Sequence, residues 1–225
     1  EALLRWNDPA RGLVPPDQFI GIAEETGLII PIGNWVLREA CRAATAWQRP
    51  GLPPVPVAVN LSARQFHDAT LDAAIESALK AAGCPPALLQ LEITETMVMS
   101  NANQALQTMD RLIALGVKLS IDDFGTGYSS LSYLKQFPVS KLKIDRSFVH
   151  DIHVDANDEA IVDAILTLAH KLGLRTVAEG VETAAQLAFL KSLGCDECQG
   201  YLYARPCPAE EFVRLLGTGL ATIPA

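Results

Sequence analysis

Two adjacent aspartates, Asp122 and Asp123, follow a run of alternating apolar residues and lead into a segment rich in Gly, Ser and Thr. This pattern is typical of a buried strand that ends in carboxylates and opens into a loop. Neighbouring side chains on a strand point to opposite faces, so the two acids can converge only where the strand ends. Two close carboxylates repel each other unless they share a proton or bind a cation. The pattern therefore indicates a cation site beside a loop suited to an anionic ligand, although Asp and Gly are also common in plain turns.

Polar residues stand at the ends of the other apolar runs as well. The candidates are Glu1, Asn60, Glu92, Asp122, Lys143, Glu179 and Gln199. Each has a plain structural explanation: Asn60 could cap the following turn, Lys143 could be a surface lysine, and Glu179 could begin a helix. Taken singly these explanations are as good as the functional ones. Their repetition at successive strand ends favours a shared site.

The side chains that could form this site select particular metals and chemistry. Carboxylate and amide oxygens, with no histidine or thiolate, favour Mg²⁺, Mn²⁺ or Ca²⁺ over zinc. So many acids suit two ions, the arrangement for in-line displacement at phosphorus, in which a bridging water becomes hydroxide. Lys143 would orient that water or stabilise charge on the phosphoryl oxygens. A glycosidase or enolase-like barrel also needs paired carboxylates, but does not explain Asn60. The segment Gly125-Thr126-Gly127 lacks the third glycine of a dinucleotide-binding fingerprint.

The elements that must position these residues alternate along the chain. Strands are expected near residues 57–59, 88–91, 117–123, 141–145, 174–178 and 194–201, and helices over residues 15–47, 71–82, 103–115, 131–136, 158–172 and 183–193 and from residue 208. Alternating strands and helices predict a parallel α/β fold. From Asn60 onward the candidate positions lie 20 to 36 residues apart, against about 31 for each unit of a (β/α)₈ barrel. A barrel gathers its strand ends at one mouth, whereas an open doubly wound sheet brings together only a pair. We therefore predict a TIM-like barrel, with residues 1–225 as a single domain.

Composition limits the partners. The chain has 225 residues, 49% of them hydrophobic, and a formal net charge of −8. An acidic protein is a poor partner for duplex nucleic acid or for an anionic membrane surface, so divalent cations are needed if the ligand carries phosphate. No apolar stretch approaches the roughly 18 residues of a membrane span.

The cysteines and the N-terminus indicate the compartment. Five cysteines, an odd number, favour free thiols in a reducing compartment. Cys195 and Cys198 have the spacing of a zinc-binding pair, but no second pair exists to complete such a site. No basic segment of a signal peptide precedes the first apolar run, so we expect a cytoplasmic location. The chain opens inside an apolar run, as if it were cut from a longer protein.

Seven segments of the chain, in this order and spacing, resemble the motifs of the EAL domain family. They are Glu1-Ala2-Leu3 with Arg5-Trp6, Asn60-Leu61-Ser62, Glu92-Ile93-Thr94-Glu95, Asp122-Asp123-Phe124-Gly125-Thr126-Gly127-Tyr128-Ser129-Ser130, Lys143-Ile144-Asp145, Glu179-Gly180-Val181-Glu182 and Gln199-Gly200-Tyr201. The resemblance runs the length of the chain. It implies a (β/α)₈ barrel of the EAL type and a phosphodiesterase that opens cyclic-di-GMP to linear pGpG with two Mg²⁺ or Mn²⁺ ions.

The resemblance also implies a role for each matching residue. Glu1, Asn60, Glu92 and Asp122 would ligate one metal ion, and Asp122 would bridge to a second ion supported by Asp123 and Glu179. The remaining roles are catalytic or substrate-binding: Lys143 and Asp145 would hold the catalytic water, Glu95 would anchor the loop that begins at Asp123, and Arg5 and Gln199 would contact the substrate.

One departure from the family pattern lies at the front of the chain. Members of the family have a further strand before the first motif, so we expect a barrel that lacks its first strand here. The alternative function is a catalytically inactive cyclic-di-GMP receptor or interaction module, which would be expected to lack metal ligands or to carry an altered loop. The expected partners are cyclic-di-GMP, an upstream sensor or diguanylate cyclase domain, and a second copy in a homodimer.

Overall fold

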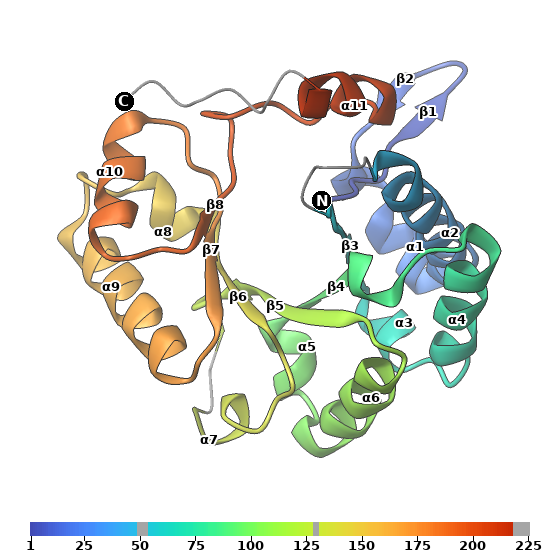
Figure 1. The fold of residues 1–225 in the computed structure, drawn as a ribbon, viewed down its shortest axis with the longest axis horizontal. Helices are drawn as coiled ribbons and strands as arrows, with labels where there is room; N and C mark the ends of the chain where they lie inside the picture. The colour runs from blue at the N-terminus through green and yellow to red at the C-terminus, as the bar shows by residue number, and fades with distance from the viewer. Residues whose placement is uncertain (49–53, 128–130, 218–225) are drawn as a thin grey trace. The chain divides into compact units, whose positions relative to one another are not determined.

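The computed structural model describes residues 1–48, 54–127 and 131–217. The chain divides into two compact units, Glu1–Ile93 with Asn103–Leu119, and Thr94–Ala102 with Ser120–Ala225. Figure 1 labels the helices and strands of both. The expectation of one domain over residues 1–225 stays a prediction. None of the helices within the described residues is long and apolar enough to cross a membrane.

The first unit is built on two parallel strands and two long helices. Strands β3 (Val57–Asn60) and β4 (Leu89–Thr94) pair in parallel, and Ala2 forms a parallel bridge to Val59. Helices α2 (Ile29–Trp47) and α4 (Leu71–Ala82) pack against each other. Both helices carry buried residues three and four positions apart, among them Leu37 and Ile75, because this spacing places apolar side chains on one helix face.

The start of the first unit differs from the prediction of one long helix over residues 15–47. Strands β1 (Trp6–Asp8) and β2 (Gly12–Val14) form an antiparallel hairpin, followed by η1 (Pro16–Gln18) and α1 (Ile20–Thr26). Gly27 ends α1 because its backbone adopts the left-handed conformation, with φ 81°. The Asp8 carboxylate accepts hydrogen bonds from the backbone N–H groups of Ala10 and Arg11, each at 2.9 Å, and so closes the hairpin turn.

Three further helices complete the first unit. These are α3 (Ala63–Phe66), η2 (Pro86–Leu88) and α6 (Ala102–Ala114). Ser62 caps α3, and Gln65 returns the hydrogen bond to the Ser62 backbone, so the two form a capping box. The plain explanation for Asn60 as the cap of this turn is therefore wrong.

The second unit contains parallel strands whose order in space follows the sequence. Strand β5 (Lys118–Phe124) pairs with β6 (Lys141–Ile144), β6 with β7 (Arg175–Ala178), and β7 with β8 (Glu197–Cys198). The middle of β5 and most of β6 and β7 are buried, as expected for parallel strands covered on both faces. Within this part of the chain, polar side chains on these strands are therefore exceptions that need partners.

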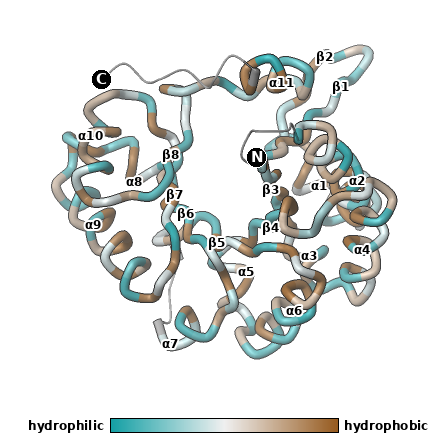
Figure 2. Tube along the Cα trace, viewed as in Figure 1, coloured by the Kyte–Doolittle hydropathy of each residue, from teal (hydrophilic) through white to brown (hydrophobic). Residues whose placement is uncertain are grey.

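Helices connect and cover these strands. They are α5 (Glu95–Met99), α7 (Leu131–Leu134), α8 (Arg146–His150), α9 (Ala156–Lys171), α10 (Ala184–Ser192) and α11 (Ala209–Gly217). Helix α9 packs against α8, β6 and β7. Figure 2 shows apolar and polar residues alternating along α9, and its buried residues are Val162, Ile165, Leu166 and Ala169. Burial of this stripe fixes the helix on the strands.

Two expectations for the second unit need comment. The strand expected over residues 194–201 pairs only at Glu197 and Cys198, because Gln199 and Gly200 leave the ladder to contact the segment that follows β7. Helix α7 is shorter than residues 131–136. Residues 128–130 of the glycine-rich motif lie outside the described residues, as do residues 49–53.

The packing of α2 against α3 generates a stability prediction for Gly33. A Cβ atom at Gly33 would lie 1.8 Å from Nε2 of Gln65, whose Oε1 accepts hydrogen bonds from the backbone N–H and hydroxyl of Ser62 at 3.2 and 3.0 Å. Gly33→Ala must therefore displace a buried, hydrogen-bonded side chain. We expect the free energy of unfolding, measured by urea denaturation, to fall by about 1–3 kcal/mol.

The matched control is Gly21→Ala in α1, where nothing lies within 4 Å of the added Cβ atom. Alanine restricts the unfolded chain more than glycine does, so this substitution should leave stability unchanged or raise it by up to about 1 kcal/mol. Equal effects of the two substitutions would contradict the packing described for Gly33.

Candidate functional site

A buried lysine lies at the centre of the candidate site in the second unit. Lys143 is on β6 and only 2% of its surface is exposed. Its Nζ atom lies 3.2 Å from Oδ1 of Asp122 on β5 and 2.6 Å from Oε1 of Glu179, which follows β7. A buried ammonium is costly unless it is paired with opposite charge. The explanation of Lys143 as a surface lysine is therefore wrong.

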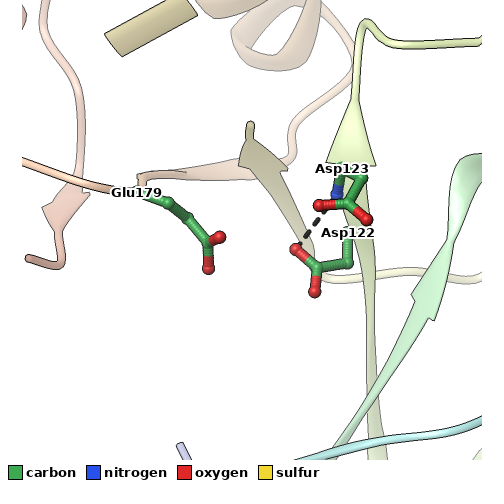
Figure 3. Close-up of side chains that lie close together, drawn as sticks. All are labelled: Asp122, Asp123 and Glu179. Atoms are coloured by element: carbon green, nitrogen blue, oxygen red, sulfur yellow. Dashed lines mark hydrogen bonds between the residues drawn. The ribbon is translucent and has the colours of Figure 1, made fainter. Parts of the chain in front are cut away.

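An irregularity in β5 brings Asp122 and Asp123 to one place. The pairing of β5 with β6 shifts register between Ile121 and Phe124, and Asp123 adopts a left-handed backbone with φ 52°. The backbone N–H of Asp123 donates to Oδ1 of Asp122 at 3.0 Å, as Figure 3 shows. A bulge of this kind cancels the strict alternation of side chains along a strand. Both carboxylates can therefore serve one site.

Three carboxylates in the second unit could hold a metal ion. Asp122, Asp123 and Glu179 each offer an oxygen atom, and these atoms lie within 4.8 Å of one another. Figure 3 shows Glu179 facing the two aspartates. The Lys143 ammonium lies within ion-pair distance of Asp122 and of Glu179. Three carboxylates around one ammonium leave an excess of negative charge, and a set of oxygen ligands suits a hard divalent cation.

The pKa values of neighbouring acids report the same crowding. Burial, together with the charges of Asp122 and Asp145, raises the pKa of Asp123 to about 6, and Lys143 opposes this rise. Asp145 caps α8 by accepting hydrogen bonds from the backbone N–H of Ser147 at 2.9 Å and from its hydroxyl. Burial works against the Asp145 charge, but the hydrogen bonds from Ser147 and Asp123 lower its pKa. The crowding of these acids therefore disfavours full ionisation of Asp123, and opposite charge nearby would relieve it.

Glu95 contacts the glycine-rich loop directly. It is the first residue of α5 and only 1% of it is exposed. Its Oε2 atom accepts a hydrogen bond from the backbone N–H of Gly125 at 2.9 Å. A Cβ atom at Gly127 would lie 3.3 Å from the Glu95 carboxylate, so the loop passes closely over this side chain. The contact ties residues 125–127 to the start of α5.

Backbone contacts that the sequence did not reveal fix the position of Gln199. Its N–H donates to the carbonyl oxygen of Ala178 at 2.8 Å, and its carbonyl oxygen accepts from Val181 at 3.1 Å. A Cβ atom at Gly200 would lie 2.2 Å from the carbonyl oxygen of Val181. Glycine is therefore required here for close approach of the two segments. The adjacent glycine in the Gln199-Gly200 pair is the sequence signal that indicates such an approach.

The first unit carries the other predicted residues. Nδ2 of Asn60 donates to Oε1 of Glu1 at 2.6 Å, and Asn60 lies opposite Glu92 in the parallel pairing of β3 and β4. Glu92 is 2% exposed. Arg5 is exposed, and its guanidinium donates to the carbonyl oxygen of Leu4 at 2.8 Å. Glu1, Asn60 and Glu92 thus lie together where β3 and β4 pair, whereas Arg5 hydrogen-bonds to its own chain neighbour.

Comparison with known proteins identifies relatives along most of the chain. The profile of the family described as "EAL domain" matches residues 1–206. The bifunctional diguanylate cyclase/cyclic di-GMP phosphodiesterase MucR of Pseudomonas aeruginosa is 51% identical over 95% of this chain and 31% of its own length. The signaling protein YkoW of Bacillus subtilis is 48% identical over 96% of this chain and 27% of its own length. The chain therefore spans less than a third of these curated relatives.

A solved structure gives the same result for the fold. The phosphodiesterase PaMucR in complex with c-di-GMP has a TM-score of 0.91 and 51% sequence identity, and the match covers 94% of this chain and 85% of that one. Together with the parallel strands and alternating helices, this similarity confirms the predicted fold class, a TIM-like α/β fold of the EAL type.

The contact between Glu95 and the loop generates a prediction. Glu95→Ala removes the acceptor for the Gly125 N–H, and a hydrogen bond to a charged group contributes about 1.5–3 kcal/mol. We expect amide hydrogen exchange at Gly125 to become at least about tenfold faster. Thr96→Ala, at the exposed neighbouring position of α5, is the control and should leave Gly125 unchanged. Unchanged exchange at Gly125 in Glu95→Ala would show that this contact does not order the loop.

Proposed function

Because the chain belongs to the EAL domain family, we propose that it hydrolyses cyclic-di-GMP to linear pGpG with Mg²⁺ or Mn²⁺. The observation that carries the proposal is the buried ammonium of Lys143 between Asp122 and Glu179, with Asp123 beside them. The named activity of the relative MucR and the cyclic-di-GMP complex of the solved PaMucR structure support the choice of substrate.

The residues present fit divalent metal ions. Asp122, Asp123 and Glu179 are all oxygen donors close to one another, and Mg²⁺ and Mn²⁺ prefer such donors. We propose two ions, and the family pattern names Glu1, Asn60 and Glu92 as further ligands. When bound, such ions neutralise phosphate charge and acidify a water molecule.

The chain's own residues then have separate tasks. The Lys143 ammonium is held in place by two carboxylates and is available to stabilise negative charge that builds on the attacking water and phosphoryl oxygens. Asp145, with its lowered pKa, stays ionised and can accept a proton or orient that water. Arg5 and Gln199 contact the substrate, and Glu95 keeps the loop after Asp123 in place. These roles follow the family pattern and belong to the same proposal.

The second candidate function is a cyclic-di-GMP receptor without catalysis. Every position that resembles a family active-site residue carries the expected residue type in this chain, which favours the enzyme. The test is chromatography of products from cyclic-di-GMP incubated with the chain and Mg²⁺ or Mn²⁺, alongside binding measured in Ca²⁺. Formation of pGpG is expected. Binding in Ca²⁺ without any turnover in Mg²⁺ or Mn²⁺ would support the receptor instead.

The proposal extends to the setting of the domain. The relatives are about three times longer or more, and MucR is also named as a diguanylate cyclase, so we propose that a sensor or cyclase domain accompanies this one. A homodimer and a cytoplasmic location belong to the same proposal. The free cysteines suit a reducing compartment.

We predict that Asp122→Asn abolishes hydrolysis while the fold persists. The amide keeps the size of the side chain but removes the charge that faces Lys143 and the proposed cations. Product formation at saturating Mg²⁺ should fall below detection, with an unchanged circular dichroism spectrum. The control is Asp163→Asn on the exposed face of α9, which should retain full activity. Near-normal turnover in Asp122→Asn would remove this carboxylate from the mechanism.

We predict that Lys143→Met lowers kcat much more than it weakens substrate binding. Methionine keeps the apolar stem but deletes the charge, whose benefit grows as negative charge develops toward the transition state. The expected loss in kcat is roughly 10²–10³-fold, measured with cyclic-di-GMP affinity at saturating metal. Lys171→Met in the last turn of α9 is the control. An unchanged kcat with a large loss of affinity would instead make Lys143 a clamp for the bound substrate.

A further inference from the structure

The turn that follows Gln199 exposes an aromatic ring beside a guanidinium group. Tyr201 belongs to the Gln199-Gly200-Tyr201 motif, and 53% of its surface is exposed. The guanidinium carbon of Arg205 lies 4.6 Å from the centre of the Tyr201 ring. We propose that the open face of this ring is the stacking site for a guanine base of the substrate, and that Arg205 holds the ring in position.

Arg205 covers one face of the ring and leaves the other face open. A cation over an aromatic ring at this distance forms a cation–π contact, which extends to about 6 Å. More than half of Tyr201 is nevertheless exposed, although the guanidinium lies on one side of its ring. The exposed surface must therefore include the opposite face of the ring.

The turn is held directly against the segment that follows β7. The backbone N–H of Leu202 donates to the carbonyl oxygen of Val181 at 3.0 Å, and the N–H of Val181 donates to the carbonyl oxygen of Gln199 at 3.1 Å. Val181 is two residues beyond Glu179, one of the carboxylates of the candidate site. These two hydrogen bonds enclose Tyr201 in the sequence and place it beside that site.

Further contacts fix the shape of the turn. The backbone N–H groups of Tyr203 and Ala204 both donate to the carbonyl oxygen of Gly200, at 3.1 and 3.4 Å. A Cβ atom at Gly200 would lie 2.2 Å from the carbonyl oxygen of Val181, so the two segments are in close contact. A ring on a turn that is already ordered loses less freedom when a ligand binds, which favours affinity.

The chemistry of the ligand assigns a base to this ring. Every nucleobase has a flat π face, and bases stack on aromatic side chains and on guanidinium planes. The carboxylates of Asp122, Asp123 and Glu179, with the proposed cations, would receive the phosphate groups, so a base must lie outside this cluster. The inference rests on the proposed function, in which the substrate is cyclic-di-GMP and its bases are guanines.

The stacking site is tested with Tyr201→Ala and Tyr201→Phe, by cyclic-di-GMP binding in Ca²⁺ and hydrolysis in Mg²⁺. Loss of base–aromatic stacking corresponds to roughly 5- to 150-fold weaker binding, which we expect for Tyr201→Ala. Phenylalanine keeps the ring, so Tyr201→Phe should bind within about threefold of the unaltered chain. The ring contacts a base and not the reacting phosphorus, so kcat at saturating substrate should stay within about threefold in both variants.

The matched control is Tyr203→Ala, because Tyr203 is a second tyrosine of the same turn and is 38% exposed. This variant should bind cyclic-di-GMP as tightly as the unaltered chain. Equal losses of affinity in Tyr201→Ala and Tyr203→Ala, or in Tyr201→Ala and Tyr201→Phe, would overturn the stacking site. A loss confined to kcat in Tyr201→Ala would overturn it as well.

The role of Arg205 is tested by combining two substitutions. An exposed cation–π contact corresponds to about two- to fivefold in binding, so we expect a loss of this size in Arg205→Ala. If Arg205 acts only through the ring, the double variant with Tyr201→Ala should bind no more weakly than Tyr201→Ala alone. A further loss in the double variant would show a direct contact of Arg205 with the ligand and would overturn its assignment as a positioning residue.

A measurement without turnover distinguishes failure of this inference from failure of the proposed function. Nuclear magnetic resonance of the tyrosine-labelled chain follows the ring protons of Tyr201, identified by their absence in Tyr201→Phe, during titration with GMP and with cyclic-di-GMP in Ca²⁺. Stacking should move them upfield, whereas ribose 5-phosphate should not. Upfield shifts without hydrolysis would contradict the proposed function and support the stacking site. Normal hydrolysis without a shift by either nucleotide would overturn the stacking site.

Discussion

The buried ammonium of Lys143 is the feature on which the second unit depends. It needs opposite charge within a few ångströms, because a buried and unpaired charge is strongly destabilising. Asp122 on β5 and Glu179 directly after β7 provide that charge at 3.2 and 2.6 Å, and β5 and β7 pair with β6 on its two sides. The three side chains can meet only if β5, β6 and β7 lie in the observed order and register. The order and register of these three strands are therefore needed both for the sheet and for the ion pairs of Lys143.

The same arrangement leaves negative charge uncompensated. The bulge in β5 adds Asp123 to the pair around Lys143, and the charge of Asp145 helps to raise the pKa of Asp123. Acids held together in this way raise one another's pKa or bind cations. A non-glycine residue in the left-handed conformation is uncommon and is maintained only where surrounding structure supports it. The bulge therefore brings the Asp122 and Asp123 carboxylates to one place, where they could bind the proposed metal ions.

Periodicity and strand-end chemistry predicted much of this from the sequence, and local backbone geometry explains the rest. Helix α4 was predictable residue by residue, because its apolar stripe ends at a glycine that takes the left-handed conformation. The break between α1 and α2 was not, because Gly27 interrupts a continuing apolar pattern. The residue types of Lys143 and Glu179 indicated a shared site, but the convergence of Asp122 and Asp123 depends on a register shift that no spacing reveals. The position of Gln199 likewise depends on a close approach of Gly200 to Val181.

The most direct test of the central claim, that these carboxylates and Lys143 direct water to phosphorus with the help of divalent cations, is hydrolysis of cyclic-di-GMP in ¹⁸O-labelled water. The products are analysed by mass spectrometry with Mg²⁺ present and after its removal by a chelator. The account predicts pGpG with one ¹⁸O atom in its new terminal phosphate, and no product once the metal is removed. Product without the label, or cleavage that continues after chelation, would contradict it.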